Sequence, residues 1–145
     1  MNKSEYAKSL FLKGYNCAQA VFLAFAEDFG FDPGMALKIS SGFGGGMGRM
    51  REVCGTVSGA IFVLNLKYGY DDSADAEAKK KLYKIIQDYM REFQALQGSY
   101  LCRELLAGTG AAVGGAPESR NEKYYKKRPC ADIVAFAAEL LEKYL

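Results

Sequence analysis

Residues 50–69 of this chain read MREVCGTVSGAIFVLNLKYG. This largely apolar segment predicts a helix over 50–68 that ends at Gly69. Gly55 and Gly59 are four residues apart and therefore lie on one side of that helix. A glycine inside a helix costs about 1 kcal/mol relative to alanine, so the presence of two glycines on one face needs a structural explanation. It either lets a neighbouring helix pack closely or lets a bulky inorganic group approach, and the sequence leaves both explanations open.

Helix start and stop signals recur on both sides of this segment. Asn16 can cap a helix over 17–29 that Gly30 ends. Asp32, followed by proline, can open another helix that ends near residue 40. The other expected elements are a helix from Ser4 to Gly14, a helix from the caps Asp71, Asp72 and Ser73 to Gln97, a helix from Ser99 to Gly108, a loop over 108–128 and a helix opened by Pro129. No segment favours a strand, so the sequence predicts an all-α, single-domain bundle of about six or seven helices spanning residues 1–145.

The longest expected helix carries a narrow apolar stripe. Leu82, Ile86, Tyr89, Phe93 and Leu96 recur at steps of four and three residues. A stripe of this kind faces the core or forms the seam of a homodimer. We expect a core face, with the homodimer as the alternative.

Composition excludes several classes of function. The chain has 145 residues, of which 50% are hydrophobic and 25% charged, with a net charge of +2. This balance gives no strong field for nucleic acid or for an anionic membrane. We expect the basic runs at 79–81 and 126–128 to be solvated surface. The chain contains no histidine, which removes Ser-His and Cys-His catalysis and histidine metal ligands.

No apolar run predicts membrane insertion or export. The run at 21–26 is too short for a signal core, and the stretch at 60–66 is far shorter than the roughly 20 residues of a membrane span. We therefore expect a cytoplasmic, reducing location. There, four cysteines are better explained as metal ligands or redox thiols than as permanent disulfides.

The four cysteines, Cys17, Cys54, Cys102 and Cys130, are the candidate site. Three of them fall in the first turn of an expected helix, where unpaired N–H groups stabilise an anion and tend to lower a thiol pKa. Cys54 is expected one turn inside its helix. Each cysteine alone can also be a small buried apolar residue. The bias of the group toward helix starts favours one shared functional site.

A glycine-rich loop precedes the central helix and reads Gly42-Phe43-Gly44-Gly45-Gly46-Met47-Gly48. It lacks the GxGxxG pattern of dinucleotide sites and the Gly-Lys-Ser/Thr ending of phosphate-binding loops. Its backbone N–H groups, beside Arg49 and Arg51, can wrap an anion or donate hydrogen bonds to sulfur. The alternative is a mobile loop without a ligand. We predict that Gly44, Gly45, Gly46, Gly55 and Gly59 contribute to cofactor binding.

The chain resembles the C_GCAxxG_C_C family of redox-active proteins. The resemblance rests on Gly-Tyr-Asn-Cys at 14–17, the glycine loop, Cys-Gly-Thr-Val-Ser-Gly at 54–59, and the isolated Cys102 and Cys130. The family's central motif is CGAxxG, and Thr56 stands here where alanine is expected. The resemblance implies a small prokaryotic protein with four signature cysteines, often encoded near transporter genes. A similar domain occurs in some cytochromes that carry an iron–sulfur centre.

Three functions are compatible with these residues. The first is a metal-thiolate site held by all four cysteines, with an iron–sulfur cluster preferred and another metal ion as the alternative. The second is thiol–disulfide chemistry between cysteine pairs. The third is an accessory or metal-sensing module that is not an enzyme. An electron-transfer or transporter-associated protein is the expected partner, and the sequence does not decide whether the protein is an enzyme.

Overall fold

The computed structural model describes all 145 residues and confirms the all-α fold. Helices contain 67% of the residues, and six of them span eight residues or more. The only β-type pairing is an isolated bridge between Val53 and Leu101. No helix is long and apolar enough to cross a bilayer.

Two helices form the centre of the molecule. α2 (Cys17–Ala26) has eight buried residues out of ten, and α5 (Gly55–Tyr68) is buried without interruption from Gly55 to Ala60. A helix that is apolar all round needs neighbours on every side, and the two pack directly on each other. The core that results is one cluster of 24 buried residues.

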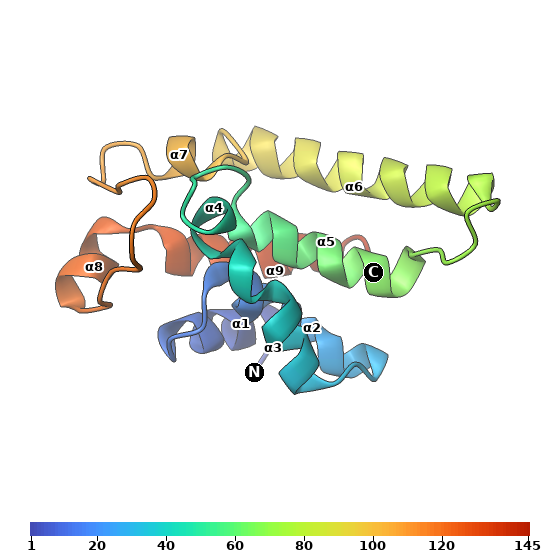
Figure 1. Cartoon of the computed structure of the whole chain (residues 1–145), viewed down its shortest axis with the longest axis horizontal. Coiled ribbons are helices and arrows are strands. Elements are labelled where there is room, and N and C mark those ends of the chain that lie inside the picture. The colour runs from blue at the N-terminus through green and yellow to red at the C-terminus, as the bar shows by residue number, and fades with distance from the viewer.

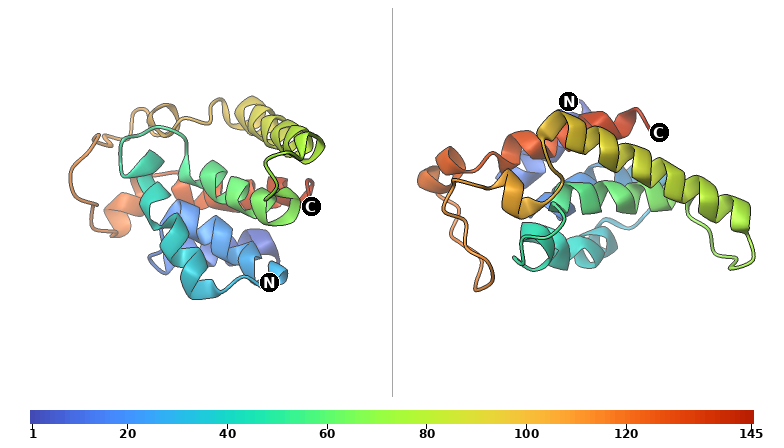
Figure 2. Two further views of the ribbon diagram at one scale, coloured as in Figure 1. Left: turned by 45° about the vertical axis from the view of Figure 1, so that its right-hand side comes forward. Right: turned by 90° about the horizontal axis from the view of Figure 1, so that it is seen from above.

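The remaining long helices cover this pair. α1 (Lys3–Leu12) packs on α2 and α9 (Cys130–Glu142), and α3 (Pro33–Ser40) covers α2. α6 (Ala76–Gln97) lies across α5 and α9, as the view from above shows (Figure 2). Short elements complete the chain: 3-10 turns at Glu27–Phe29 and Ser41–Phe43, and the helices α4 (Gly44–Met47), α7 (Cys102–Leu105) and α8 (Glu122–Lys127). The glycine loop, α7 and α8 gather at one end of the molecule, on the left in Figure 1.

Local capping signals placed several helices correctly. Asn16 caps α2 in a capping box with Gln19, and Asp32 caps α3 ahead of Pro33. Two other predicted caps were wrong, and a third, Ser99, is described below. α1 is capped by Asn2 rather than Ser4, and α6 by Asp75 rather than by residues 71–73. In both cases an Asn or Asp nearby in the chain accepts the hydrogen bond from the third helical N–H.

The predicted start of the central helix at residue 50 was wrong. α5 begins at Gly55, because Met47, Arg49 and Arg51 adopt positive φ and the chain that follows is extended. That extended segment pairs with the segment before α7. Cys54 N–H donates to the Tyr100 carbonyl at 2.8 Å, and Cys102 N–H donates to the Glu52 carbonyl at 2.6 Å. Tertiary pairing thus overrides local helix propensity here.

Two further boundaries also differ from expectation. α7 starts at Cys102 rather than at Ser99, whose hydroxyl instead accepts from the Leu101 N–H. The predicted loop over 108–128 contains α8, capped by Asn121. A single turn of helix in a glycine-rich region has too little apolar pattern to be recognised from sequence.

The stripe on α6 is mostly core, as expected. Leu82, Tyr89 and Phe93 are buried, while Ile86 is partly buried. Leu96 is 61% exposed and departs from the expectation. The homodimer alternative stays a prediction.

We predict that Gly59→Ala destabilises the fold. A Cβ built at Gly59 would lie 2.6 Å from the Ala18 carbonyl oxygen of α2, so the two central helices must move apart. Overpacking of this kind costs about 1–3 kcal/mol. Urea unfolding should show this loss. Gly42→Ala is the control, because a Cβ there meets nothing within 4 Å, and an equal loss in both variants would contradict the prediction.

Candidate functional site

The structure brings all four cysteines to one cavity of about 60 Å³. Cys17, Cys102 and Cys130 are the first residues of α2, α7 and α9. The prediction that Cys54 lies one turn inside its helix was wrong, because Cys54 is the N-cap of α5. All four thiols therefore stand at helix N-termini. No disulfide joins them.

The direction of the long helices explains this convergence. α5 and α9 both begin at the end of the molecule that holds the glycine loop, α7 and α8 (Figure 1). α2 contributes its own N-terminus to the same cavity through Cys17. These three helices have 10, 14 and 13 residues, long enough for their N-termini to carry partial positive charge. The cavity is therefore suited to an anionic occupant.

Glycines make the close packing around the sulfurs possible. A Cβ built at Gly55 would lie only 2.4 Å from the Cys17 sulfur and 2.9 Å from the Phe43 carbonyl oxygen. Gly46 has a φ of 73°, and a Cβ there would lie 2.7 Å from the Cys102 Cβ. Neither position can hold another residue without displacing a cysteine.

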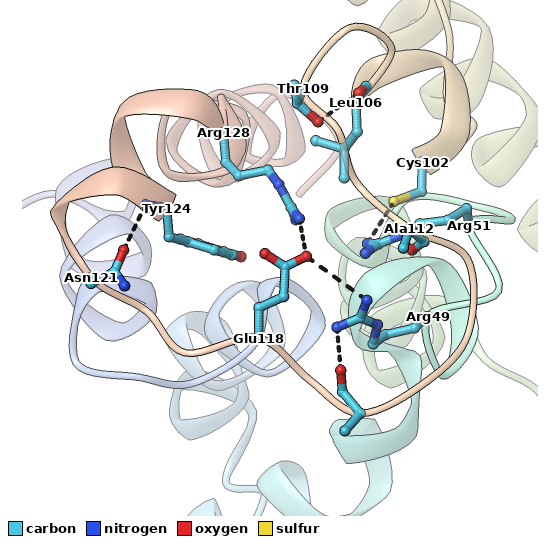
Figure 3. Close-up of polar contacts among 11 residues, drawn as sticks. Arg49, Arg51, Cys102, Leu106, Thr109, Ala112, Glu118, Asn121, Tyr124 and Arg128 are labelled. Atoms are coloured by element: carbon cyan, nitrogen blue, oxygen red, sulfur yellow. Dashed lines mark hydrogen bonds and ion pairs between the residues drawn. The ribbon is translucent and has the colours of Figure 1, made fainter.

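Three hydrogen bonds reach the sulfurs from different parts of the chain. The backbone N–H of Gly45 donates to Cys17, which lowers the pKa of that thiol. Arg51 Nη1 donates to the Cys102 Sγ at 3.7 Å (Figure 3). The Thr56 hydroxyl lies 3.1 Å from the Cys54 Sγ and lowers the Cys54 pKa. Thr56 therefore adds a contact to the Cys54 sulfur.

Burial outweighs these contacts in setting the thiol pKa values. Removal from water raises the pKa of Cys17 and of Cys54 well above their usual range, and raises the pKa of Cys130 to about 12. The prediction that helix starts would lower the pKa was wrong for Cys17 and Cys130. Charge repulsion adds to the effect, and Cys17 raises the pKa of both Cys54 and Cys130 more than Cys102 does.

The other walls of the cavity are basic and apolar. Arg51, Arg120 and Arg128 line it, and no carboxylate does. Phe11, Leu105, Leu106 and Ile133 form its apolar surface. Positive side chains around buried sulfurs stabilise negative charge on them, and the charges of Arg128 and Arg120 lower the Cys130 pKa against the effect of burial.

Only part of the predicted cofactor-binding set lines this cavity. Gly45 and Gly55 do. Gly44 and Gly59 pack against Asn16 and α2, and Gly46 lies behind Cys102. These three glycines shape the surroundings without lining this cavity, and a role for them in cofactor binding stays a prediction.

Sequence reasoning missed most of the arginines. Arg51 was recognised beside the glycine loop, but Arg120 was not singled out. Arg128 was assigned to a solvated basic run, yet its side chain is only 6% exposed. It stacks on the Tyr124 ring at 4.9 Å. Pro129 follows Arg128 and fixes the start of α9 beside the cavity. This neighbour is the sequence signal that could have indicated that Arg128 is buried there.

No three cysteine, aspartate or glutamate side chains are arranged to hold one metal ion. A single Zn²⁺ ion needs four ligands in a tetrahedron, with Zn–S distances of about 2.3 Å. In a [2Fe–2S] cluster each iron takes two of the four thiolates, so no three of them need to surround one ion.

The fold and the site define an all-α protein with a buried four-cysteine centre. Residues 15–144 match the family described as "Putative redox-active protein (C_GCAxxG_C_C)", so the chain belongs to this family. No curated protein and no solved structure matches the chain.

We predict that the reduced, metal-free protein loses stability in alkaline solution through its buried thiols. The Cys130 pKa is about 12 in the folded chain against 9.0 for an ordinary thiol. Between these values the unfolded state binds fewer protons than the folded state, so stability falls as pH rises from about 9 toward 12. The slope is about 1.4 kcal/mol per pH unit for each such thiol.

Cys130→Ala should make the fall in unfolding free energy between about pH 9 and 12 less steep by the contribution of one thiol, about 1.4 kcal/mol per pH unit. Urea unfolding of the wild-type and variant proteins at several alkaline pH values measures the difference. Because lysines and tyrosines titrate in both proteins, their contribution cancels in the comparison. The same pH dependence of the unfolding free energy in both proteins would show that burial does not raise the Cys130 pKa.

Proposed function

We propose that this redox-family protein binds an iron–sulfur cluster in the cysteine cavity, with Cys17, Cys54, Cys102 and Cys130 as ligands, and serves in electron transfer or sensing. The observation that carries the proposal is that four helix-start thiols face one cavity with three arginines and no carboxylate. A cluster with four thiolate ligands is anionic, and this cavity is built for negative charge.

Size favours the smaller type of cluster. A water molecule needs roughly 10–15 Å³ of such a cavity, so about 60 Å³ holds about four to six atoms of that size. A [2Fe–2S] core has four atoms. The pairwise ligand set of that core also agrees with the absence of any three-residue ion site.

The surrounding residues have separate tasks in this proposal. When bound, the cluster supplies a one-electron redox couple. The Gly45 N–H and the Arg51 guanidinium stabilise negative charge at Cys17 and Cys102. The apolar walls exclude water. Because the thiols are protonated when free, binding releases protons and depends on pH. An electron-transfer partner is part of the proposal, since a one-electron couple needs a donor and an acceptor.

Anaerobic purification with iron and acid-labile sulfide analysis tests the proposal. We expect brown protein with equal iron and sulfide. Cys17→Ser should lower cluster binding by about tenfold or more, since losing even an outer-shell partner typically costs 10–100-fold. Ser58→Ala is the matched control, because Ser58 is buried in α5 but does not line the cavity. Colourless protein after reconstitution with iron and sulfide would contradict the proposal.

Thiol–disulfide chemistry is the second candidate. It is favoured by the position of Cys17, whose charge acts on both Cys54 and Cys130. Here two thiols pass two electrons and two protons to a partner disulfide as they join. Metal-free protein whose free-thiol count falls by two on oxidation, and does not fall in Cys17→Ser, would favour this candidate over the cluster.

A further inference from the structure

A second, larger cavity adjoins the cysteine cavity. It measures about 370 Å³ and lies between the glycine loop, the segment 115–120 and α8. Six residues line both cavities: Asn16, Gly45, Arg51, Arg120, Tyr124 and Arg128. We call this second cavity the arginine pocket, because Arg49 joins the other three arginines there.

Positive charge in the arginine pocket greatly exceeds negative charge. Four arginines line it, against a single carboxylate, Glu118. The Arg49 and Arg128 side chains are only 12% and 6% exposed. Buried guanidinium groups are costly unless their charges are compensated, and these two share the single Glu118 carboxylate, so the excess charge needs an explanation.

Most of the guanidinium hydrogen bonds end on neutral acceptors. Arg51 Nε donates to the Ala112 carbonyl at 2.9 Å, and Arg120 donates to the carbonyls of Phe11 and Tyr15. These bonds position the guanidinium groups without neutralising them. Arg49 Nε is buried and has no hydrogen-bond partner at all.

The Glu118 carboxylate shows what the pocket recognises. One of its oxygens lies 2.5 Å from Arg128 Nη2 and 3.8 Å from Arg49 Nη2, so it stands between the two arginines (Figure 3). Glu118 is 43% exposed and belongs to a segment without regular secondary structure. It can therefore turn toward solvent and leave both arginines free.

We propose that the arginine pocket binds a small oxyanion from solution, a carboxylate or a tetrahedral inorganic anion, in the place that the Glu118 carboxylate occupies. Guanidinium groups bind such oxygens through charge-assisted, often paired hydrogen bonds. An oxyanion held there lies next to the cysteine cavity, because Arg51 lines both cavities and contacts Cys102. The pocket is a substrate or effector site at the entrance to the thiol centre.

Arg49 distinguishes binding of an oxyanion from a second explanation, in which the arginines only compensate the charge of the cysteine thiolates. Arg51, Arg120 and Arg128 also line the cysteine cavity and can serve the sulfurs there. Arg49 and Glu118 line only the arginine pocket. Neither residue contacts a sulfur. Glu118 can act on the cysteines through Arg128, so Arg49 is the residue that reports on anion binding separately.

The test is calorimetric titration of the reduced, metal-free full-length protein with sulfate and, separately, with acetate, at ionic strength held constant with chloride. Because the cysteines carry no metal in this experiment, its result does not depend on whether the protein binds a cluster. We expect saturable binding of one anion per chain. Sulfate binding alone would identify a tetrahedral anion as the ligand, and acetate binding alone a carboxylate.

Substitutions within the pocket should move the affinity in opposite directions. Arg49→Gln should weaken binding by about tenfold. Arg49→Lys should recover part of the loss, because it restores the charge but not the planar fork. Glu118→Gln should tighten binding by about two- to fivefold, because it removes the competing carboxylate and frees both arginines. Thermal unfolding of each variant confirms that it is folded.

Arg91 provides the matched control. It is exposed on α6 and lines neither cavity. Arg91→Gln removes the same charge as Arg49→Gln and should leave the affinity unchanged. The proposal is overturned if neither wild-type nor Glu118→Gln protein binds either anion saturably. It is also overturned if Arg91→Gln weakens binding as much as Arg49→Gln does, because binding then follows net charge alone.

Discussion

The close contact between α2 and α5 is the constraint on which the rest of the structure depends. Two glycines on one face of α5 let α2 approach until its backbone and the Cys17 sulfur fill the space that side chains would otherwise take. Gly59 serves the packing of the helices, and Gly55 serves the position of the sulfur. Close packing therefore explains both glycines, and the approach of an inorganic group to this face stays a prediction.

Opposing electrostatic effects meet at the sulfurs. Helix N-termini, the Gly45 N–H and the arginines favour the thiolate form, while burial favours the neutral thiol. Burial is the larger effect for Cys17, Cys54 and Cys130. These three thiols, when free, are therefore protonated at neutral pH and are poor nucleophiles. A bound metal changes this balance, because it brings compensating positive charge into the cavity. A centre built this way is better suited to holding a ligand than to attacking a substrate.

The strained segment between the glycine loop and α5 joins the two cavities. Arg49 and Arg51 both have positive φ, which is uncommon for residues other than glycine and costs free energy. The strain places Arg51 against Cys102 and Arg49 in the arginine pocket. Hydrogen bonds hold the segment, because the Arg51 carbonyl accepts from both the backbone and the side chain of Arg103. One short stretch of chain thus contributes arginines to both the cysteine cavity and the arginine pocket.

The sequence by itself determined the fold class, the caps of α2 and α3 and the position of three cysteines at helix starts. These features depend on side-chain to backbone bonds within a few residues, such as that of Asn16. Only the tertiary structure decided that α5 begins after Cys54, because pairing with residues 100–103 competes with local helix propensity. It alone also decided that burial raises the thiol pKa values and that Arg128 turns inward. Desolvation and charge compensation depend on segments far apart in the chain, and no local pattern records them.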